Sequence, residues 1–476
     1  MATYPVIIGG AGPAGLTAAH ELVQNGVPPL VLEAADQVGG LARTEVWQGY
    51  RIDIGGHRFY TKEPEVQELW EDLLGADFLR RRRLSRIYFN GRFYRYPLSL
   101  ANVMGNLGII ESLRIVASYI GAQLRPLHPE ETFEQWVVNR FGRRLFNTFF
   151  KTYTEKVWGI PCAEIRAEWA AQRIKGLSFT AAVANALFRR RNVRSLIEEF
   201  HYPRLGPGQM WERCRDRVEA LGGRVLLRTP VRGFRWEGRR VTAVRVGEGE
   251  IVRELEAEHY ISSLPLDRLV LTMDPPPSTQ ILQAARGLRY RDFILVALVV
   301  NRSQLFPDNW VYVHAPEVRV GRIQNFKNWS PDMVPDPTRT CLGMEYFCTR
   351  DDDLWRTEDT RLVELAAREL EQLGLAQSVD VEKGCVIRQP KAYPIYDGDY
   401  RGHLRVLQDF LAGFENLQTI GRNGMHRYNN QDHSMLCGLF AARHVLGTGY
   451  DLWEVNTERS YYEEQQLPSR GHPATT

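Results

Sequence analysis

The 476-residue sequence lacks closely spaced cysteine pairs. Its six cysteines are scattered, and none belongs to a C-x-x-C motif. This pattern argues against a disulfide framework or a structural zinc site and indicates reduced thiols in a cytosolic protein. No apolar run approaches the roughly 18 residues that a membrane-spanning helix needs. No charged segment of a signal peptide precedes the first apolar run at Val6. We therefore expect a cytoplasmic protein without a transmembrane segment.

A strong net charge is also missing. The formal charge at pH 7 is only +3, so no general attraction to nucleic acid is expected. Arginines nevertheless form two clusters, at 80–83 and 189–191. Each cluster is interpreted either as an ordinary solvated surface or as a site that attracts an anionic substrate or a membrane surface. Peripheral membrane contact therefore stays open.

The chain opens with a nucleotide-binding pattern. The motif G-x-G-x-x-G, at Gly10, Gly12 and Gly15, lies between a short apolar run and a helical pattern over 13–25. The first glycine permits a tight turn, the second lets the backbone approach a pyrophosphate, and the third lets the helix pack on the strand. Glu33 ends the next apolar run, where its carboxylate can bind ribose hydroxyls. A carboxylate there disfavours a 2′-phosphate, so the ligand is NAD or FAD.

Two further glycine motifs distinguish between these dinucleotides. V-G-G-L-A-R-T occupies 38–44, and D-I-G-G-H occupies 53–57. Both resemble loops of the amine oxidase and UDP-galactopyranose mutase superfamily of flavoproteins, in which the first loop wraps the pyrophosphate and the second passes the flavin ring. Glycine is needed wherever backbone lies directly against a planar ring. The resemblance implies FAD, bound non-covalently.

The C-terminal part carries a matching segment. I-G-R ends at Arg422, and N-Q-D-H-S opens an amphipathic helical pattern at Asn430. In the superfamily the N-terminus of this helix points at the pyrimidine edge of the flavin, where reduced flavin is negative, and a residue at the position of Val231 contacts the adenine through its backbone. The motifs and the resemblance together predict the following FAD-binding residues: Gly10, Gly12, Pro13, Ala14, Gly15, Glu33, Ala34, Gly40, Leu41, Ala42, Arg43, Gly55, Gly56, His57, Val231, Gly421, Arg422, Asn430, Gln431, Asp432, His433 and Ser434.

Motifs in the middle of the chain point to one branch of the superfamily. Y-T-E-K-V-W-G-I-P at 153–161 and W-A-A-Q-R-I at 169–174 are similar to the sugar-nucleotide segment of UDP-galactopyranose mutases. There the tryptophan borders the uridine pocket and the arginine approaches the diphosphate, which implies these roles for Trp158 and Arg173. G-R-I-Q-N-F-K-N-W-S-P, from 321, resembles the strand that carries a second arginine against the diphosphate, here Arg322.

Further positions match the same branch. Tyr393, and Tyr428 with Asn430, fall where the mutases place two tyrosines and an asparagine beside a phosphate, and His57 falls on the histidine of the loop over the flavin. From the residues alone, arginines and tyrosines from distant segments suit a diphosphate, because guanidinium groups bind it bidentately. One position departs: the mutases read uracil with a glutamine, and Ser99 stands in its place.

Two flavoenzyme reactions stay open. By resemblance to the mutases, N5 of the reduced flavin attacks the anomeric carbon of a nucleotide-diphosphate sugar, and its pyranose and furanose forms interconvert. Arg173 and Arg322 then stabilise the departing diphosphate, and His57 holds the flavin loop. NAD(P)H is the candidate reductant. The alternative resembles the protoporphyrinogen oxidases, phytoene desaturases and amine oxidases: an oxidoreductase that takes hydride from an apolar or amine substrate. An apolar tunnel would favour the oxidoreductase, and a paired-arginine pocket the mutase.

These features predict an α/β fold, with a discontinuous Rossmann-like FAD-binding domain, a helical insertion and a mostly antiparallel β-sheet substrate domain. We place the FAD-binding domain at 1–75, 205–265 and 405–465, a helical substrate-capping domain at 100–200, the β-sheet substrate domain at 76–99 and 266–404, and a flexible tail at 466–476.

Overall fold

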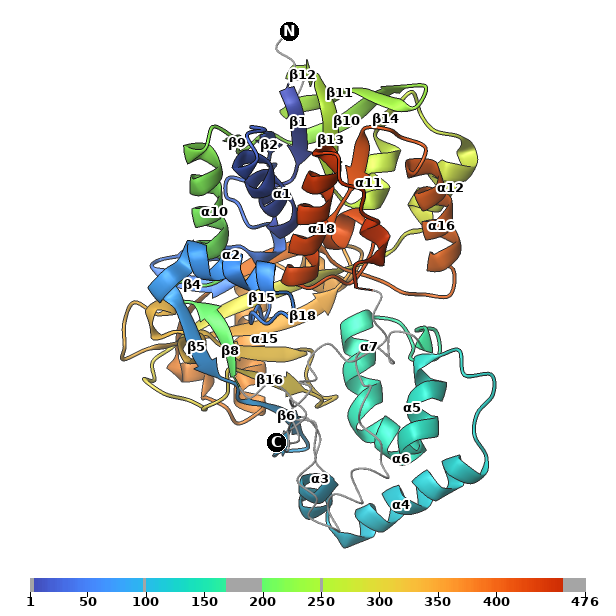
Figure 1. The fold of residues 1–476 in the computed structure, drawn as a ribbon. Coiled ribbons are helices and arrows are strands. Elements are labelled where there is room, and N and C mark those ends of the chain that lie inside the picture. Colours follow the sequence, from blue (N-terminus) through green and yellow to red (C-terminus); the bar gives the residue numbers. More distant parts are fainter. Residues whose placement is uncertain (1–3, 97–99, 168–198, 249–250, 457–476) are drawn as a thin grey trace, which may run out of the picture.

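The computed structural model describes residues 4–96, 100–167, 199–248 and 251–456. Within these ranges the predicted α/β fold is confirmed, since a parallel sheet and a larger, mostly antiparallel sheet form the body of the molecule (Figure 1). The boundaries of the individual domains stay a prediction.

The parallel sheet unites three distant parts of the chain. Its order is β20 (Leu417–Thr419), β13 (Ala257–Ser262), β1 (Tyr4–Gly9), β2 (Leu30–Leu32) and β9 (Arg224–Leu226). Every neighbouring pair is parallel. The nucleotide-binding fold is therefore assembled from discontinuous segments, and the carboxyl ends of β1 and β2 meet at one edge.

Both faces of the parallel sheet are covered, which explains its continuous apolar strands. Val6 and Ile8 of β1 pack into a core with helices α1 (Pro13–Gln24), α10 (Gly208–Ala220) and α18 (Gln431–Val445). Ile7 faces the opposite core, which contains α11 (Leu266–Leu271), α12 (Thr279–Gly287), α16 (Tyr400–Leu411) and strands of a four-stranded sheet. That sheet has the order β12 (Ile251–Leu255), β11 (Arg240–Glu248), β10 (Val231–Glu237) and β14 (Met273–Asp274).

Helix α1 begins and ends for local reasons. Pro13 occupies its first turn, where no backbone donor is needed. Leu16, Leu22 and Val23 are buried against the sheet. Gly26, with φ +75°, follows its end, and Val27 N–H donates to the Leu22 carbonyl at 3.0 Å. The predicted helix and its glycine stop are therefore present, one residue shorter than expected.

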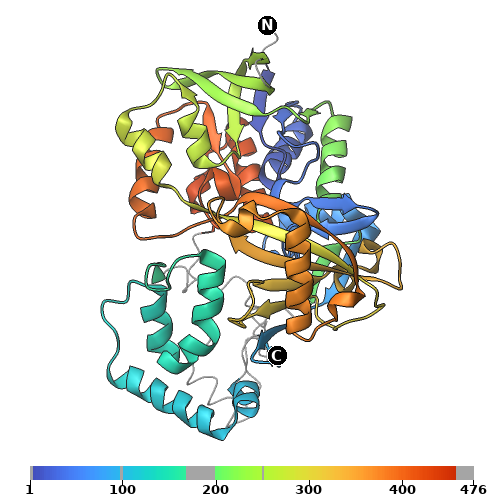
Figure 2. The same cartoon turned by 180° about the vertical axis from the view of Figure 1, so that it is seen from behind.

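The larger sheet has seven strands. Its order is β19 (Val381–Pro394), β15 (Tyr290–Val300), β18 (Thr340–Cys348), β17 (Arg322–Asn325), β16 (Trp310–Val313), β6 (Ser85–Phe89) and β7 (Arg92–Arg95). Only β16 and β6 pair in parallel. Helix α15 (Asp359–Gln372) covers one face (Figure 2), and α13 (Phe326–Trp329) packs on the other. β15 and β18 are consequently buried along nearly their whole length.

A group of helices forms one end of the molecule (Figure 1). It comprises α3 (Leu100–Leu107), α4 (Ile109–Leu124), α5 (Phe133–Phe141), α6 (Arg143–Leu145) and α7 (Thr152–Trp158). They share an aromatic core that includes Phe133, Phe146 and Phe149. Thr132 caps α5 by accepting a hydrogen bond from Gln135 N–H at 3.3 Å. The remainder of the predicted helical insertion, 168–198, lies outside the described residues.

Smaller elements connect these parts. They are the hairpin of β3 (Thr44–Trp47) and β4 (Tyr50–Asp53), the pair of β5 (Phe78–Arg82) and β8 (Glu199–Pro203), and helices α2 (Pro64–Leu74), α14 (Asp353–Arg356) and α17 (Gly421–Gly424). Most of the arginine cluster 80–83 therefore lies on a strand, where Arg80 forms an ion pair with Glu199. The second cluster, 189–191, lies outside the described residues.

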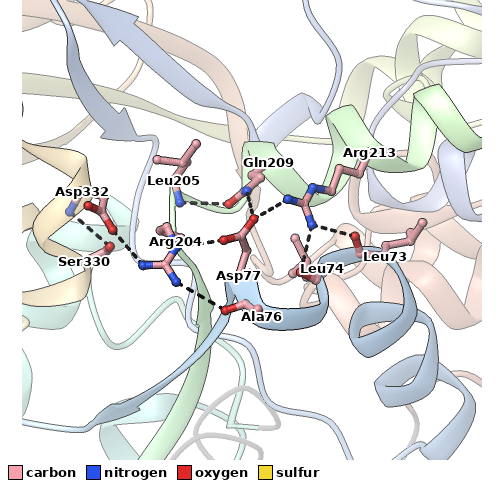
Figure 3. Close-up of polar contacts among 10 residues, drawn as sticks. All are labelled: Leu73, Leu74, Ala76, Asp77, Arg204, Leu205, Gln209, Arg213, Ser330 and Asp332. Carbon is pink, nitrogen blue, oxygen red and sulfur yellow. Dashed lines mark hydrogen bonds and ion pairs between the residues drawn. The ribbon is translucent and has the colours of Figure 1, made fainter.

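Asp77 links the end of helix α2, the segment after β8 and helix α10 (Figure 3). Its carboxylate accepts hydrogen bonds from Arg204 Nε at 2.8 Å, from Gln209 Nε2 at 3.0 Å and from Arg213. Arg204 also reaches Asp332, with 3.2 Å between nitrogen and oxygen, and Arg213 donates to the last carbonyls of α2. Hydrogen bonds from Arg204 and the two nearby cations hold the pKa of the Asp77 carboxyl below its usual range.

We expect Asp77→Asn to lower the free energy of unfolding by about 1 kcal/mol at neutral pH, because charge-assisted hydrogen bonds are lost at a partly exposed site. A carboxyl whose folded pKa is lowered contributes fully above its unfolded pKa, and the contribution is lost as pH falls through the folded pKa. Denaturant unfolding should therefore show a difference in free energy of unfolding between the wild type and Asp77→Asn at neutral pH. This difference should become smaller in acid. Asp72→Asn, at the more exposed Arg217 ion pair, is the control and should cost less. Equal losses of unfolding free energy in the two variants, or a loss in Asp77→Asn that does not change with pH, would contradict the role of Asp77.

Candidate active site and cofactor cavity

A cavity of about 870 Å³ opens at the carboxyl ends of β1 and β2. In open α/β sheets this edge is where ligands bind. Most of the predicted FAD-binding residues line it: Gly10, Gly12, Pro13, Ala14, Glu33, Ala34, Gly40, Leu41, Ala42, Arg43, His57, Val231, Gly421, Arg422, Asn430, Gln431 and Ser434. Fold and sequence motifs thus converge on a single cavity.

The floor of this cavity is backbone. A Cβ atom added to Gly12 would lie 3.7 Å from Gly40 Cα, and one added to Gly40 would lie 3.2 Å from Gly12 Cα. Gly15 lies behind the wall, where an added Cβ would come within 1.9 Å of the Gly10 carbonyl oxygen. Gly15 therefore allows α1 to pack on β1, whereas Gly12 and Gly40 leave room inside the cavity.

Glu33 follows β2 at the rim. Its carboxylate accepts hydrogen bonds from Ala11 N–H at 2.8 Å and from Ala35 N–H at 2.9 Å. Each carboxylate oxygen has two lone pairs, so both keep acceptor capacity toward a ribose. The volume, the backbone floor, this carboxylate and the N-terminus of α1 fit the parts of a dinucleotide.

The start of α18 lies between this cavity and a second one. Asn430 and Gln431 line both cavities, Ser434 lines the first, and Asp432 lines the second. His433 instead caps the helix, because its Nδ1 accepts a hydrogen bond from Asn430 N–H at 3.3 Å. Asp432 is buried, and within the described residues its Oδ2 has no hydrogen-bond partner. Burial raises the pKa of Asp432 to about 7.

The second cavity has a volume of about 290 Å³ and shares walls with the first at Leu41, His57 and Arg422. Gly55 and Gly56 line it. Three arginines, Arg58, Arg322 and Arg422, also line it. Its remaining lining is rich in phenols and indole, contributed by Tyr60, Tyr96, Tyr153, Tyr312, Tyr393, Tyr428 and Trp158. The cavity is therefore polar and cationic, in contrast to an apolar tunnel.

Arg322 is held by a buried acid. Its Nε donates to Glu345 Oε2 at 2.5 Å, and Gln324 Nε2 donates to the other oxygen of Glu345 at 2.7 Å. Arg322 on β17 and Glu345 on β18 are register partners. Burial raises the pKa of the Glu345 carboxyl, and its negative charge holds the pKa of Arg322 above the ordinary value against the opposing effect of burial. The guanidinium is thus fixed in the cavity wall beside Gly55.

Three predicted substrate-binding residues come together with Arg422. The Tyr393 and Tyr428 rings stack with centroids 5.6 Å apart, and the Trp158 ring lies 6.4 Å and 6.2 Å from them. The Arg422 guanidinium carbon lies 4.8 Å from the Tyr428 ring and 5.5 Å from the Tyr393 ring. Burial raises the pKa of Tyr393 to about 12. Its phenol is therefore a neutral hydrogen-bond donor at physiological pH.

His57 lies where the two cavities meet. Its Nε2 is 2.8 Å from the Ile54 carbonyl oxygen, which can only accept, so Nε2 is the protonated nitrogen. Burial lowers the pKa of His57 to about 4, and the cations of Arg422 and Arg322 act in the same direction. His57 is therefore a neutral imidazole at neutral pH, and its Nδ1 is left as an acceptor.

Sequence reasoning missed several residues of the second cavity, namely Glu345 behind Arg322, Tyr153 and Tyr312 in the wall, and the inward placement of Arg422 beside the substrate tyrosines. A helical signal could have found Tyr153, because it precedes Val157 by one turn and both line the cavity. The predicted catalytic and substrate-binding residue Arg173 lies outside the described residues, as does Ser99.

The sequence pattern of flavin containing amine oxidoreductases matches residues 13–422. The chain belongs to this family. It is a FAD-dependent enzyme, in agreement with the nucleotide cavity described above. No helix within the described residues has the length and apolar character needed to cross a membrane.

Relatives of the chain differ in their reactions. It is 23% identical to a 15-cis-phytoene desaturase of Synechococcus elongatus, over 95% of this chain and 98% of that protein. It is 24% identical to a probable UDP-galactopyranose mutase of Klebsiella pneumoniae, over 34% of this chain and 43% of that protein. The crystal structure of a reduced UDP-galactopyranose mutase superposes with a TM-score of 0.83 at 21% identity, covering 97% of this chain and 100% of that one. At this identity the likeness establishes the fold alone.

Proposed function

We propose that this FAD-dependent enzyme interconverts the pyranose and furanose forms of a nucleotide-diphosphate sugar. The observation that carries the proposal is the pair of guanidinium groups, Arg322 and Arg422, in the wall of a polar cavity that adjoins the nucleotide cavity. Guanidinium groups bind diphosphates bidentately, whereas an apolar substrate offers no acceptor to the donors in the cavity wall.

The residues predicted to be catalytic or to bind the substrate each have a place in this reaction. FAD held by the residues of the nucleotide cavity would, in its reduced form, supply a nucleophilic nitrogen for displacing the diphosphate from the anomeric carbon. Arg322, together with Arg173, stabilises the negative charge that builds on the leaving diphosphate. Tyr393 donates a hydrogen bond to a phosphate, because its phenol stays protonated at neutral pH, and Tyr428 supplies a second phenol stacked beside it.

The remaining assignments support that arrangement. Trp158 borders the nucleoside, and Asn430 adds an amide beside the phosphate. His57 holds the glycine loop through the Ile54 carbonyl, and its Nδ1 would accept a hydrogen bond from the bound cofactor. Departure of the diphosphate needs no side-chain general acid, because a diphosphate leaves without taking a proton. NAD(P)H is the proposed reductant that brings the cofactor to its active form.

The test is conversion without net oxidation. We would incubate the purified holoenzyme, reduced with dithionite under anaerobic conditions, with UDP-, GDP- and dTDP-hexoses labelled with heavy oxygen between the anomeric carbon and phosphorus. We expect one nucleotide sugar to yield its ring isomer and to scramble the label into the non-bridging positions, and only with reduced enzyme. Absence of both signals across the panel would overturn the proposal.

A second function has one observation in its favour. The phytoene desaturase relative matches this chain over almost the full length of both proteins. An oxidoreductase would take hydride from its substrate, so an amine or an apolar polyene would bleach the oxidised flavin under anaerobic conditions. Bleaching by such a substrate, without label scrambling by any nucleotide sugar, would select this alternative.

A further inference from the structure

Helix α4 turns a row of large apolar side chains away from the molecule. Ile109, Ile110, Leu113, Ile120 and Leu124 expose 80%, 71%, 65%, 52% and 77% of their surface. Intervals of three, four and seven residues place such side chains on one face of a helix. The opposite face of α4 packs on α5 and α6 and buries Ile115.

The row lies at the outer edge of the molecule. Helices α3 and α4 form the extremity of the helical end in both views (Figures 1 and 2). Met104 of α3 adds a further exposed apolar side chain. Among the described residues, the row therefore lies at an edge that a flat surface can approach. Contiguous exposed apolar surface of this kind marks an interaction site.

The surroundings of the row are basic. From Leu100 to His128, the stretch that contains α3 and α4, the sequence has two arginines, Arg114 and Arg125, and a single acidic residue, Glu111. Glu111 is already neutralised by Arg144, with 2.8 Å between nitrogen and oxygen. Arg114 projects from α4 with 62% of its side chain exposed, and Arg92 contacts the end of α3 through the Asn106 carbonyl. A second copy of the chain would bring these arginines face to face, whereas an anionic surface complements them.

We propose that α4 docks on the anionic surface of a lipid bilayer, with its axis in the membrane plane. Its apolar row would enter the boundary between headgroups and acyl chains, and the nearby arginines would contact the headgroups. At 16 residues α4 is about 24 Å long, which is less than the roughly 30 Å of a hydrocarbon core. The contact is therefore peripheral. This proposal does not depend on which reaction the flavin site performs.

Vesicle co-sedimentation tests the proposal with the intact holoenzyme. Vesicles of phosphatidylcholine alone would be compared with vesicles that also contain phosphatidylglycerol. We expect at least about tenfold stronger binding to the anionic vesicles, and this preference should fall with added salt. Arg114→Gln/Arg125→Gln should reduce the preference.

The apolar contribution is tested by Ile110→Gln/Leu113→Gln/Leu124→Gln, which should weaken binding to anionic vesicles at least about tenfold. Glutamine keeps good helix propensity. Leu221→Gln/Val379→Gln changes exposed apolar side chains elsewhere and should bind as the wild type does. All variants should keep the activity of the wild type in solution, because the flavin and substrate cavities lack these residues.

Three results would overturn the proposal. The first is that the wild-type protein stays in the supernatant with both vesicle types. The second is a dimer in analytical ultracentrifugation that the triple glutamine variant loses, which would make the row a contact between copies. The third concerns an environment-sensitive fluorophore attached at Leu113→Cys: we expect its emission to shift to the blue when anionic vesicles are added. Emission already shifted in the free monomer would mean that the chain itself covers the row.

Discussion

The double variant Arg322→Ala/Glu345→Gln is expected to lose at least about a hundredfold in turnover of the nucleotide sugar while keeping its flavin. Removing one donor aimed at developing negative charge commonly costs that much. Arg322 lines the second cavity and does not line the nucleotide cavity. Its partner must change as well, because Glu345 is fully buried. Arg322→Ala alone would leave that acid unpaired, at a cost of about 3–5 kcal/mol to the fold.

Glu345→Gln is the matched control. It removes the buried charge but keeps an acceptor for Arg322 Nε, so its turnover should change much less than that of the double variant. Turnover, flavin absorbance per protein and thermal unfolding would be measured on all three proteins. Arg173→Ala should likewise abolish turnover and retain flavin. If the flavin is lost in proportion to activity, these arginines belong to the cofactor site or the core, and the substrate assignment is wrong.

Gly12→Ala is expected to give a folded protein that binds FAD about ten- to a hundredfold more weakly. The φ angle of Gly12 is −82°, which alanine adopts freely, and the nearest described atom to the added Cβ lies at 3.7 Å. The protein itself therefore tolerates the methyl group. A pyrophosphate lying against this backbone would not, and overpacking of this kind costs about 1–3 kcal/mol.

Alanine variants of two other glycines serve as controls for this experiment. Gly15→Ala should impair folding, since its methyl group would lie 1.9 Å from the Gly10 carbonyl oxygen. Gly402→Ala, on α16 with no described atom within 4 Å of the added Cβ, should impair neither folding nor FAD binding. FAD titration and melting of the apoprotein measure both properties. Wild-type FAD affinity in Gly12→Ala would place the pyrophosphate elsewhere.

The local sequence determined the nucleotide-binding unit. β2 spans Leu30–Leu32, the apolar run that precedes Glu33, and α1 spans Pro13–Gln24, close to the helical pattern over 13–25. Such elements are readable because the signals that define them lie within a few residues: apolar periodicity, a turn glycine, or a stop such as Gly26. The same holds for the glycine motifs, whose role depends on backbone rather than on distant partners.

Only the tertiary structure decided what surrounds those elements. Glu345 meets Arg322 through the register of β17 and β18, and the Arg422 guanidinium lies against the Tyr393 and Tyr428 rings. Helix α4 carries apolar residues on two faces, and the positions of α5 and α6 decide which face is left exposed. Sequence alone cannot assign such pairings, because they depend on which long-range contacts the whole chain makes at once.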